Sequence, residues 1–538
     1  MKQPVGRRRR IRWLAYVRAW RSWSVLEGLV GTILITAGSL TPAYLPLNSP
    51  WWSRLNEAGL RGSTWRIVGT LLVLVGVGLL VDSWLRLRPG REPRDLTAEP
   101  LPKHARRCFK HLPGIRAGLH PWAVLGVWGL PFLLAPPIFS HDAYSYAAQG
   151  WLLENGISPY EGYPGLLPGA FADQVAQEWR YTKTPYGPLA LVVQHGIVHL
   201  TGDNPYWSSV FMRVPALLGV IAIGLLLSRV ARRVGRDPHF AAWFSTLNPI
   251  LVVDFIGGAH NDALMMGLVV IGLWIACMTS WSWAIGAVLV GGAAAVKQPA
   301  FMVAVALPLI RHPMASWHPR HLFPALGRTV GSLTISVAVF SGISWASGLG
   351  FGWYHAVNVP GMVLTVSPFT LVGMGVRMVL GSFGAHQAAA AVIPISQAIG
   401  MLVGVFLLVV MAVRLLPRKP LSFLALGFLA VALCAPALHS WYVLWGALLL
   451  PLIDEAARFV RPAVWTPSSC CPSMRSTCPG AIVPQLLVLR WSWCWRPAWC
   501  GTNTAWDKGG RTKTFTFRTP QGPLTVRAPG MQRIVRWR

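Results

Sequence analysis

The chain has 538 residues, of which 53% are hydrophobic and only 12% are charged, and its mean hydropathy is +0.46. Soluble domains carry about 25% charged residues, so this composition excludes an ordinary soluble protein. The apolar runs have the length of about 17–25 residues that crosses a bilayer core. We therefore predict an all-α integral membrane protein.

The net charge of +30 comes from Lys and Arg clusters that lie between apolar runs. These clusters begin at Arg7, Arg86, Arg229, Arg311 and Arg414. Lys and Arg concentrate in cytoplasmic loops because their translocation is unfavourable. We therefore attribute the basic excess to topology and expect a lipid bilayer, not nucleic acid, as the partner. No A-x-A-like cleavage site follows the N-terminal arginines, so we expect a retained first helix and a cytoplasmic N-terminus.

The apolar runs predict about twelve transmembrane helices. Their expected ranges are 25–45, 66–85, 120–139, 210–228, 240–256, 262–278, 281–296, 299–310, 328–347, 388–413, 421–438 and 441–456. With the N-terminus inside, every basic cluster lies on the cytoplasmic side. The apolar segments 186–200 and 367–381 would break this pattern if they crossed, so we expect interfacial or re-entrant helices on the outer side.

The same pattern divides the chain into four parts. They are a basic cytoplasmic N-terminus (1–24), two transmembrane helices with a cytoplasmic loop (25–118), a membrane domain (119–457) and a basic tail (458–538). The membrane domain includes a large outer loop, 140–209. The tail holds five of the eight cysteines, and its Cys- and Trp-rich stretches show neither helical nor strand periodicity. We expect it to be disordered or the product of a shifted reading frame.

The outer loop has an acid, Asp142, close to its start. If a helix continues from the third apolar run, Asp142, Tyr146 and Gln149 lie on one face, because they are spaced by four and seven residues. A carboxylate near the end of a membrane helix either faces water or is functional, since its burial is costly. A transporter would more often place polar residues near mid-membrane in broken helices.

Other polar residues stand at the outer ends of apolar runs, and each has an ordinary explanation. Asn261 or Asp262 would cap the helix that follows. Lys297 and Arg377 would be cations that extend toward the interface, although Lys297 could instead hold a phosphate. The cluster of His439, Trp441 and Tyr442 (439–442) is typical of an aromatic belt. Their joint position on one side favours an outward-facing site.

Nucleotide-binding motifs are missing from the sequence. It contains no G-x-x-x-x-G-K-[ST], no G-x-G-x-x-G opening a Rossmann unit and no H-E-x-x-H. A cytoplasmic nucleotide-sugar or ATP site therefore has no support from motifs. The energy for a bond-forming reaction must then arrive with the substrate.

Several stretches resemble the polytopic glycosyltransferases of the GT-C class. They are "HDAYSYAAQGWLLENGISPY", "YTKTPYGPLALV", "LNPILVVDFIGGAHNDALMMGLVVIGLW", "AAVKQPAFMV" and "HSWYVLW". Within this class, residues 25–457 most resemble the actinobacterial polyprenol-phosphate-mannose-dependent α-1,6-mannosyltransferases. The resemblance implies a GT-C-like fold that transfers mannose from polyprenyl-phosphate-mannose to a lipid-anchored mannan on the outer face of the plasma membrane, for lipomannan-type envelope glycolipids.

The resemblance also implies roles for individual residues. Asp142 would be the catalytic base, Asp262 a second acid near the site, and Lys297 a contact for the donor phosphate. The family often has an acid just before the base, where this chain has His141. We expect further substrate-binding side chains from the same outer stretches: His141, Tyr146, Tyr186, His260, Asn261, Gln298, His439 and Tyr442. We expect no cofactor and no metal ligand, and a divalent metal remains open.

The expected chemistry follows from the donor. A polyprenyl-phosphate sugar has an ionised leaving group, so one carboxylate that deprotonates the acceptor hydroxyl is sufficient, contributing about 10²–10⁴ in rate. A single attack on a β-linked donor gives an α product, so we expect inversion. Two alternatives remain open: a flippase or transporter for lipid-linked sugars, and the same fold acting on another lipid-linked sugar.

Overall fold

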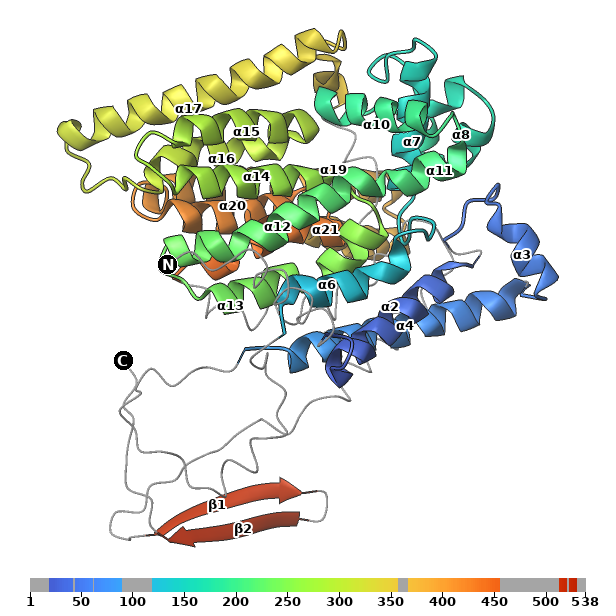
Figure 1. Cartoon of the computed structure of the whole chain (residues 1–538), viewed down its shortest axis with the longest axis horizontal. Helices are drawn as coiled ribbons and strands as arrows, with labels where there is room; N and C mark the ends of the chain where they lie inside the picture. Colours follow the sequence, from blue (N-terminus) through green and yellow to red (C-terminus); the bar gives the residue numbers. More distant parts are fainter. Residues whose placement is uncertain are drawn as a thin grey trace, which may run out of the picture. The chain divides into compact units, whose positions relative to one another are not determined.

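The computed structural model describes residues 19–41, 44–60, 62–89, 119–356, 366–454, 512–519 and 522–529 (Figure 1). The chain divides into two compact units, Met1–Gly480 and Ala481–Arg538. Three features predicted from the sequence lie outside the described residues: the arginines from Arg7 to Arg12, most of the cytoplasmic loop before residue 119, and the five tail cysteines.

All described elements of the first unit are helices. Its N-terminal elements are α2 (Trp23–Ser39), α3 (Trp51–Glu57), α4 (Gly62–Arg86), α6 (Pro121–Gly129) and the 3₁₀ helix η2 (Leu130–Phe132). The long helices α2 and α4 pack along each other, and α2 also contacts α6. These elements correspond to the first three predicted helices.

The predicted outer loop folds into short helices, as expected. They are α7 (Asp142–Glu154), η3 (Pro164–Leu166), α8 (Ala170–Asp173), α9 (Gln177–Arg180), α10 (Pro188–Leu200) and α11 (Pro205–Phe211). Helices α7 and α10 pack together. The carboxylate of Glu154 lies 2.8 Å from His195 Nε2 and 3.2 Å from His199 Nδ1. These two histidines of segment 186–200 therefore join it to α7.

The central part of the unit is a row of packed helices. It comprises α12 (Arg213–Arg233), α13 (Pro238–Ala241), the π-helices η4 (Ala242–Thr246) and η5 (Leu251–Gly257), α14 (Asp262–Ala276), α15 (Trp283–Val296), η6 (Gln298–Ala300), α16 (Phe301–Ala306), η7 (Leu307–Leu309) and α17 (Pro319–Ala346). Helices α12, α14, α15 and α17 are neighbours in that order (Figure 1). Consecutive helices thus lie side by side, as short connections require.

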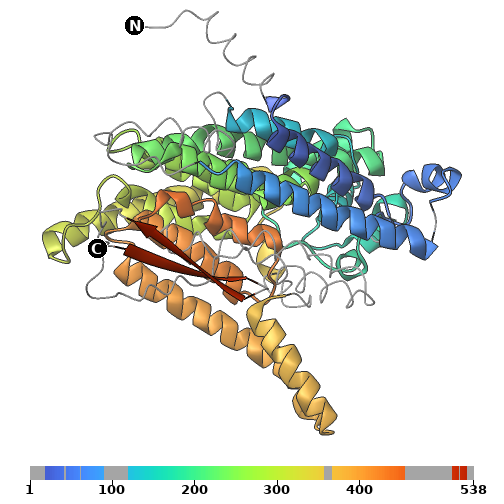
Figure 2. The ribbon, with the colours of Figure 1, turned by 90° about the horizontal axis from the view of Figure 1, so that it is seen from below.

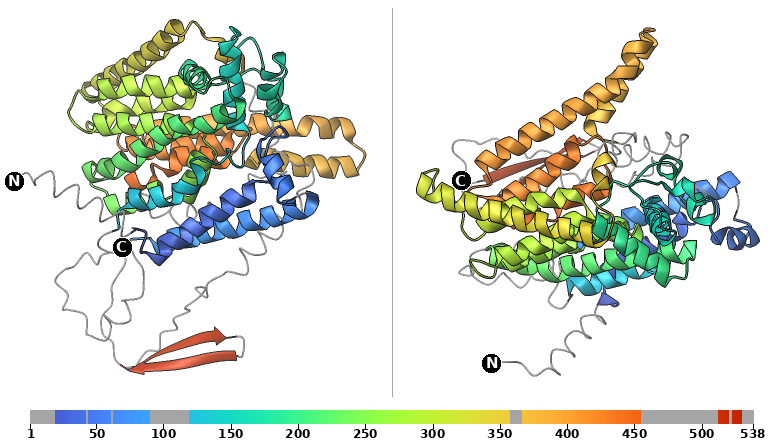
Figure 3. Two further views of the ribbon diagram at one scale, coloured as in Figure 1. Left: turned by 45° about the vertical axis from the view of Figure 1, so that its right-hand side comes forward. Right: turned by 90° about the horizontal axis from the view of Figure 1, so that it is seen from above.

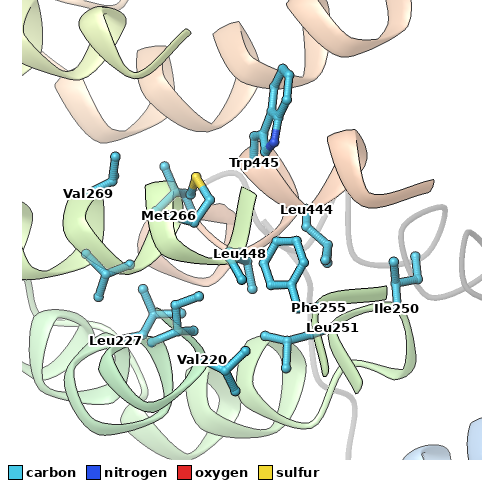
Figure 4. Close-up of a cluster of buried hydrophobic side chains, with 14 of the residues drawn as sticks. Val220, Leu227, Ile250, Leu251, Phe255, Met266, Val269, Leu444, Trp445 and Leu448 are labelled. Carbon is cyan, nitrogen blue, oxygen red and sulfur yellow. The ribbon is translucent and has the colours of Figure 1, made fainter. Parts of the chain in front are cut away.

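The remaining elements close the first unit. They are η8 (Gly352–Ala356), α18 (Pro368–Ser382), α19 (His386–Arg414), α20 (Pro420–Cys434), α21 (Ser440–Ala447) and η10 (Leu450–Leu452). Helices α18 and α19 pack along each other, and one end of the pair projects from the other helices of the unit (Figures 2 and 3). Buried side chains of α12, η5, α14 and α21 meet in one core cluster (Figure 4).

A close approach of two backbones sets the crossing of α12 and α14. A Cβ placed on Gly219 would lie 2.0 Å from the carbonyl oxygen of Ala263, and one on Gly267 would lie 2.5 Å from the Cα of Gly219. Small residues at such crossings let membrane helices pack closely. Because α14 begins at Asp262, this crossing also fixes the position of the candidate site.

Several helices are long and apolar enough to cross a membrane. Four described helices meet this criterion by length and composition, or up to five if the bent pair η4–η5 is one span, and nine shorter apolar helices accompany them. These helices are typical of a membrane protein. The predicted number of about twelve spans stays a prediction.

The structure corrects two predicted helices. Helix 120–139 ends at Phe132, so Asp142 begins a new helix instead of continuing the third run; Pro131, Pro136 and Pro137 account for this, because proline ends or breaks helices. Helix 240–256 is interrupted around Pro249, and its halves are bent by 55°.

The second unit departs from the all-α prediction. Its described residues form an antiparallel hairpin of β1 (Thr512–Thr519) and β2 (Gly522–Pro529), which pairs Thr512 with Pro529 and Thr519 with Gly522. The expectation that the tail is disordered or frame-shifted stays a prediction, and its described residues form this hairpin. The physical reason for the first strand is the alternation of Thr and Phe in "TKTFTF", a period-two pattern that predicts a strand.

Candidate active site

Two loops, which precede Asp142 and His260, form the base of the candidate site. The backbone N–H of Ile138 donates to the carbonyl of Gly257 over 3.2 Å. The residues next to this contact have unusual backbones, with φ of 61° at Phe139 and 57° at Ala259. Positive φ at a non-glycine residue costs free energy and persists only where the surroundings enforce it. The two loops therefore hold each other in place.

Arg213 binds the same two loops from α12. Its side chain is 2% exposed. Nε donates to the carbonyl of Ile256 over 2.7 Å, Nη2 to that of Gly257 over 3.1 Å, and Nη1 to that of Leu133 over 3.0 Å. A buried guanidinium needs such partners because its desolvation is costly. It satisfies the carbonyls of the last two residues of η5 and of the residue after η2, and so anchors both loops to α12.

Asp142 lies at the centre of a polar cluster at the start of α7. One carboxylate oxygen, Oδ2, is 3.5 Å from the donating hydroxyl of Tyr146 and 3.4 Å from Nδ1 of His260. The Tyr146 hydroxyl is also 3.3 Å from Oδ1 of Asn261. Helix α7 contains Asp142, Tyr146 and Gln149 at the predicted spacing. Tyr146 contacts Asp142, whereas Gln149 accepts a hydrogen bond from Thr184.

The surroundings of Asp142 keep its carboxylate ionised. Burial acts to raise its pKa, but the neighbouring side chains of His260, His439 and Lys297 outweigh burial and lower the pKa to about 2. Nearby cations and donated hydrogen bonds both favour the charged form of a carboxyl group. At neutral pH, Asp142 is therefore a carboxylate that can accept a proton.

A buried ion pair lies next to this cluster. Lys297 Nζ is 2.9 and 3.0 Å from the two carboxylate oxygens of Asp262, and Nε1 of Trp445 donates to Asp262 Oδ1 over 2.7 Å. The ammonium also lies 4.3 Å from the ring centroid of Tyr442 and 5.7 Å from that of Tyr186. Aromatic faces attract cations. Lys297 is thus a held cation, and the prediction that it extends toward the interface is wrong.

Aromatic rings connect the parts of the site. His260 stacks on Trp441 with 3.6 Å between ring centroids, and Trp441 stacks on His439 at 4.5 Å. The ring of Tyr146 meets that of Tyr186 edge-on at 5.2 Å. Trp441 is buried, so this cluster differs from the exposed aromatic belt that the sequence suggests. The stack fixes the plane of His260 beside Asp142.

The structure brings most of the predicted site residues together. They come from the start of α7, the segment before α10, the start of α14, the end of α15 and the start of α21: Asp142, Tyr146, Tyr186, His260, Asn261, Asp262, Lys297, His439 and Tyr442. The predicted cap at the start of α14 is wrong, because the Asn261 side chain makes no capping hydrogen bond and the Asp262 carboxylate binds Lys297.

Two predicted substrate-binding residues, His141 and Gln298, make contacts elsewhere, and Arg377, expected to extend toward the interface, has no predicted role in binding. His141 Nε2 donates to the carbonyl of Tyr44 over 3.0 Å, and its ring meets Tyr144 edge-on. Gln298 donates to the carbonyl of Pro185 over 3.0 Å and so positions the segment before α10. Arg377 is exposed on α18. The substrate-binding roles of His141 and Gln298 have no support from these contacts.

Sequence reasoning missed two buried residues of the site. Trp445 binds Asp262, and it follows Tyr442 by three residues on α21, a spacing that places both on one helix face. Asp254 is 4% exposed and accepts a hydrogen bond of 2.6 Å from Ser440. An acid inside an apolar run is a signal of function. In the part of the chain that the structure describes, no three His, Cys, Asp or Glu side chains are grouped to hold a metal ion.

Comparison with known proteins identifies the family. Residues 25–312 match the model of the alpha-(1->6)-mannopyranosyltransferase N-terminal domain, and residues 369–477 match that of the MptB C-terminal domain. The first match includes four residues of the site, Asp142, His260, Asp262 and Lys297, and the second match includes α21. The second match continues beyond Asp454, the last described residue of the first unit.

Full-length relatives support the same assignment. A probable alpha-(1->6)-mannopyranosyltransferase of Mycolicibacterium smegmatis is 34% identical over 80% of this chain and 79% of its own length. Alpha-(1->6)-mannopyranosyltransferase A of Mycobacterium tuberculosis is 30% identical over 80% of each chain, and alpha-(1->6)-mannopyranosyltransferase B of Corynebacterium glutamicum is 28% identical over 81% and 73%. No solved structure matches significantly. The chain therefore belongs to the alpha-(1->6)-mannopyranosyltransferase family of glycosyltransferases.

Proposed function

We propose that the protein transfers mannose from a polyprenyl-phosphate donor to a membrane-anchored mannan acceptor, with formation of an α-1,6 linkage and inversion at the anomeric carbon. One observation carries this proposal: in a chain of this family, an ionised carboxylate, Asp142, shares a buried cluster with a held cation, Lys297. Tyr146 and Tyr186 link the two, because Tyr146 contacts both Asp142 and Tyr186, whose ring lies 5.7 Å from Lys297 Nζ.

In the proposed reaction, Asp142 is the general base. The acceptor hydroxyl attacks the anomeric carbon while its proton passes to Asp142, and the bond between that carbon and the phosphate oxygen breaks. The leaving phosphate is already ionised and needs no acid. A carboxylate with a pKa near 2 is a weak base, but the negative charge of the bound phosphate opposes the neighbouring cations and raises that pKa. Donor binding would thereby activate the base.

Lys297 would stabilise the charge on the departing phosphate. A lysine binds phosphate as a point charge, and a cation fixed before the reaction stabilises developing charge without reorganisation. Asp262 and Trp445 hold the ammonium in place. Part of its charge is balanced by Asp262, so the phosphate would share the ammonium with that carboxylate.

The membrane context completes the proposal. The N-terminus would be cytoplasmic and the site would face outward, where a lipid-linked donor can supply activated sugar without nucleotides. Apolar grooves between helices would accept the polyprenyl chain. The product would contribute to lipomannan-type glycolipids of the cell envelope. Each step of the proposed reaction uses side chains of the protein and its two substrates.

Mannosyl transfer in isolated membranes tests the proposal. Membranes with the native chain or Asp142→Asn receive labelled polyprenyl-phosphate-mannose and a short α-linked mannose acceptor. New α-1,6-linked product from the native chain only is the expected result, with a loss of about 10²–10⁴ in rate for the variant. Glu161→Gln, an exposed acid of the same loop, is the matched control and should retain activity.

Three outcomes would overturn parts of the proposal. Full activity of Asp142→Asn, with the variant inserted normally, would remove Asp142 as the base. Movement of labelled donor across vesicle membranes without a new glycosidic bond would support a transporter instead. Product formed only with a different labelled polyprenyl-phosphate sugar would keep the reaction type and change the donor.

A further inference from the structure

A cavity of about 350 Å³ lies beside the first turns of α7, separate from the ion pair. Its walls come from segment 44–50, α7, α8 and the start of α11. The side chains that matter for recognition are Asn48, Tyr144, Gln174, Asn204, Tyr206 and Trp207; the others are Pro, Ser and Ala. Since ligand pockets usually hold about 300–1,000 Å³, this cavity can accept a small organic group.

The lining suits a neutral, hydroxyl-rich ligand. No Lys, Arg, Asp or Glu stands among the described residues that line the cavity. A phosphate would need a cation, so the cavity fits neither the donor's charged group nor a free anion. The less buried rings of Tyr206 and Trp207 can pack against the C–H faces of a sugar ring, and the exposed amides of Asn48 and Asn204 can form hydrogen bonds with its hydroxyls. This combination favours a saccharide.

Gln174 provides an independent sign of a ligand. Its side chain is 4% exposed, and its Nε2 finds no hydrogen-bond partner in the described part of the chain. Buried donors are normally satisfied, and each exception requires an explanation. Rotation of this side chain toward the cavity that Gln174 lines would let a sugar hydroxyl accept the hydrogen bond.

The walls are fixed by hydrogen bonds that leave the interior open. Trp51 Nε1 donates to the Tyr206 hydroxyl over 2.9 Å, and Asn48 Nδ2 donates to the carbonyl of Ala170 over 2.7 Å. The side chain of His141, the residue just before Asp142, donates to the carbonyl of Tyr44. The segment between α2 and α3 is thereby attached to the start of α7, and Tyr144 on α7 lines the cavity.

We infer that this cavity binds a mannosyl unit of the acceptor chain that is remote from the reacting hydroxyl. The identity of the sugar as mannose rests on the proposed function, whereas the preference for a neutral saccharide rests on the lining alone. Such a subsite would let the enzyme prefer an elongated acceptor. It would also give His141 a positioning role, through Tyr44, instead of direct contact with the reacting sugars.

Direct binding tests the inference without relying on transfer. The full chain in lipid nanodiscs is titrated, without donor, with α-1,6-mannotetraose and with maltotetraose, and binding is followed by calorimetry. We expect the native chain to bind mannotetraose at least tenfold more tightly than maltotetraose, and Ala170→Trp to weaken mannotetraose binding at least tenfold. Ala170 lines the cavity and is exposed, so a larger side chain there is expected to occupy cavity space without disturbing the core. Ala58→Trp, at an exposed position outside the lining, is the matched control.

Acceptor length provides the second readout. We expect Ala170→Trp to lower the ratio of kcat/KM for mannotetraose to that for mannobiose about tenfold, mainly through KM, while Ala58→Trp leaves the ratio unchanged. Equal binding by Ala170→Trp and the native chain would overturn the subsite. Equal binding of both tetrasaccharides would overturn its assignment to mannan. Normal binding with no transfer by the native chain would refute the proposed reaction and leave the saccharide site standing.

Discussion

The lowered pKa of Asp142 links the candidate base to folding stability. Its ordinary value is 3.8 and its value in the folded protein is about 2. Because the folded value is the lower one, the unfolded chain binds the proton more readily, and the ionised carboxylate stabilises the folded state. This contribution is fully present above pH 3.8 and is lost as the pH falls through about 2; it is on the order of 2 kcal/mol.

Asp142→Asn should therefore change the pH dependence of stability. We expect the difference in unfolding midpoint between the native chain and the variant to shrink as the pH falls from 6 toward 2.5, measured by thermal unfolding in nanodiscs. The same measurement on Glu161→Gln, an exposed position of the same loop, is the control. A constant difference over this range would mean that the Asp142 carboxylate gains no net stabilisation from His260, His439 and Lys297.

The ion pair of Lys297 and Asp262 allows a double-variant cycle. Removing one partner leaves the other charge buried, which costs about 3–5 kcal/mol. We expect Lys297→Met to be destabilised by that amount and to lose mannosyl transfer. Adding Asp262→Asn should restore most of the stability, since the amide oxygen can still accept from Trp445, without restoring transfer.

The cycle separates the two roles of Lys297. If the double variant stays as unstable as Lys297→Met, an unpaired Asp262 carboxylate is not the cause of the instability. If the double variant regains full transfer, Lys297 does not contact the donor phosphate. Thermal unfolding and transfer are measured on the same nanodisc preparations.

Single residues of the site were predictable to the extent that they interrupt apolar runs. Asp142, His260, Asp262 and Lys297 stand out in the sequence for that reason, and the structure brings them together. Trp445 could not be distinguished from the many other aromatic residues. The direction of the His141 side chain depends on Tyr44, about a hundred residues earlier, and no local pattern encodes such a contact.

At the scale of elements, the close crossing of α12 and α14 predicts that a larger residue at position 219 destabilises the protein. The Cβ of Gly219→Ala would fall 2.0 Å from a backbone oxygen that cannot rotate away. Overpacking of this kind costs about 1–3 kcal/mol or more. We expect a lower unfolding midpoint and reduced transfer, because a displaced α14 moves Asp262 and the preceding His260. Thermal unfolding in nanodiscs checks the stability, and mannosyl transfer checks the site.

Gly78→Ala is the control for this substitution. Gly78 lies in the long apolar helix α4, and no atom approaches an added Cβ there within 4 Å. Alanine has the higher helix propensity by about 1 kcal/mol, so this variant should be as stable as the native chain or slightly more so. Equal behaviour of the two variants would show that α12 and α14 can separate without cost.

Elements were predictable where hydropathy alone defines them. Each of the twelve predicted apolar runs contains a helical segment, because apolar runs of this length have few other stable conformations in a bilayer. Their interruptions were harder to predict. The bend around Pro249 and the early end of α6 depend on proline and on local hydrogen bonds, such as that from Ile250 N–H to Asn248. The hairpin of the second unit was overlooked because cysteine and tryptophan dominate the preceding stretch.

For the whole molecule, the proposed orientation can be tested with single cysteines. Glu161 lies in the outer loop and Ala315 in the basic cluster that begins at Arg311, and both are exposed. We expect a membrane-impermeant maleimide to label Glu161→Cys in intact cells and to label Ala315→Cys only after the cells are opened. The native chain gives the background from its own cysteines. The reverse pattern would place the site in the cytoplasm and contradict a lipid-linked donor used outside.

The paired loops before Asp142 and His260 have a consequence for when the site is assembled. Phe139 and Ala259 have positive φ angles that their surroundings enforce, and Arg213 fixes the neighbouring carbonyls. The base and its histidine are therefore preorganised, and the entropy of aligning them is lost during folding, before a sugar arrives. On binding, the donor and the acceptor then lose only their own translational and rotational entropy. A slow lipid-bound acceptor, which meets the enzyme by diffusion in two dimensions, would find the catalytic groups already aligned at each encounter.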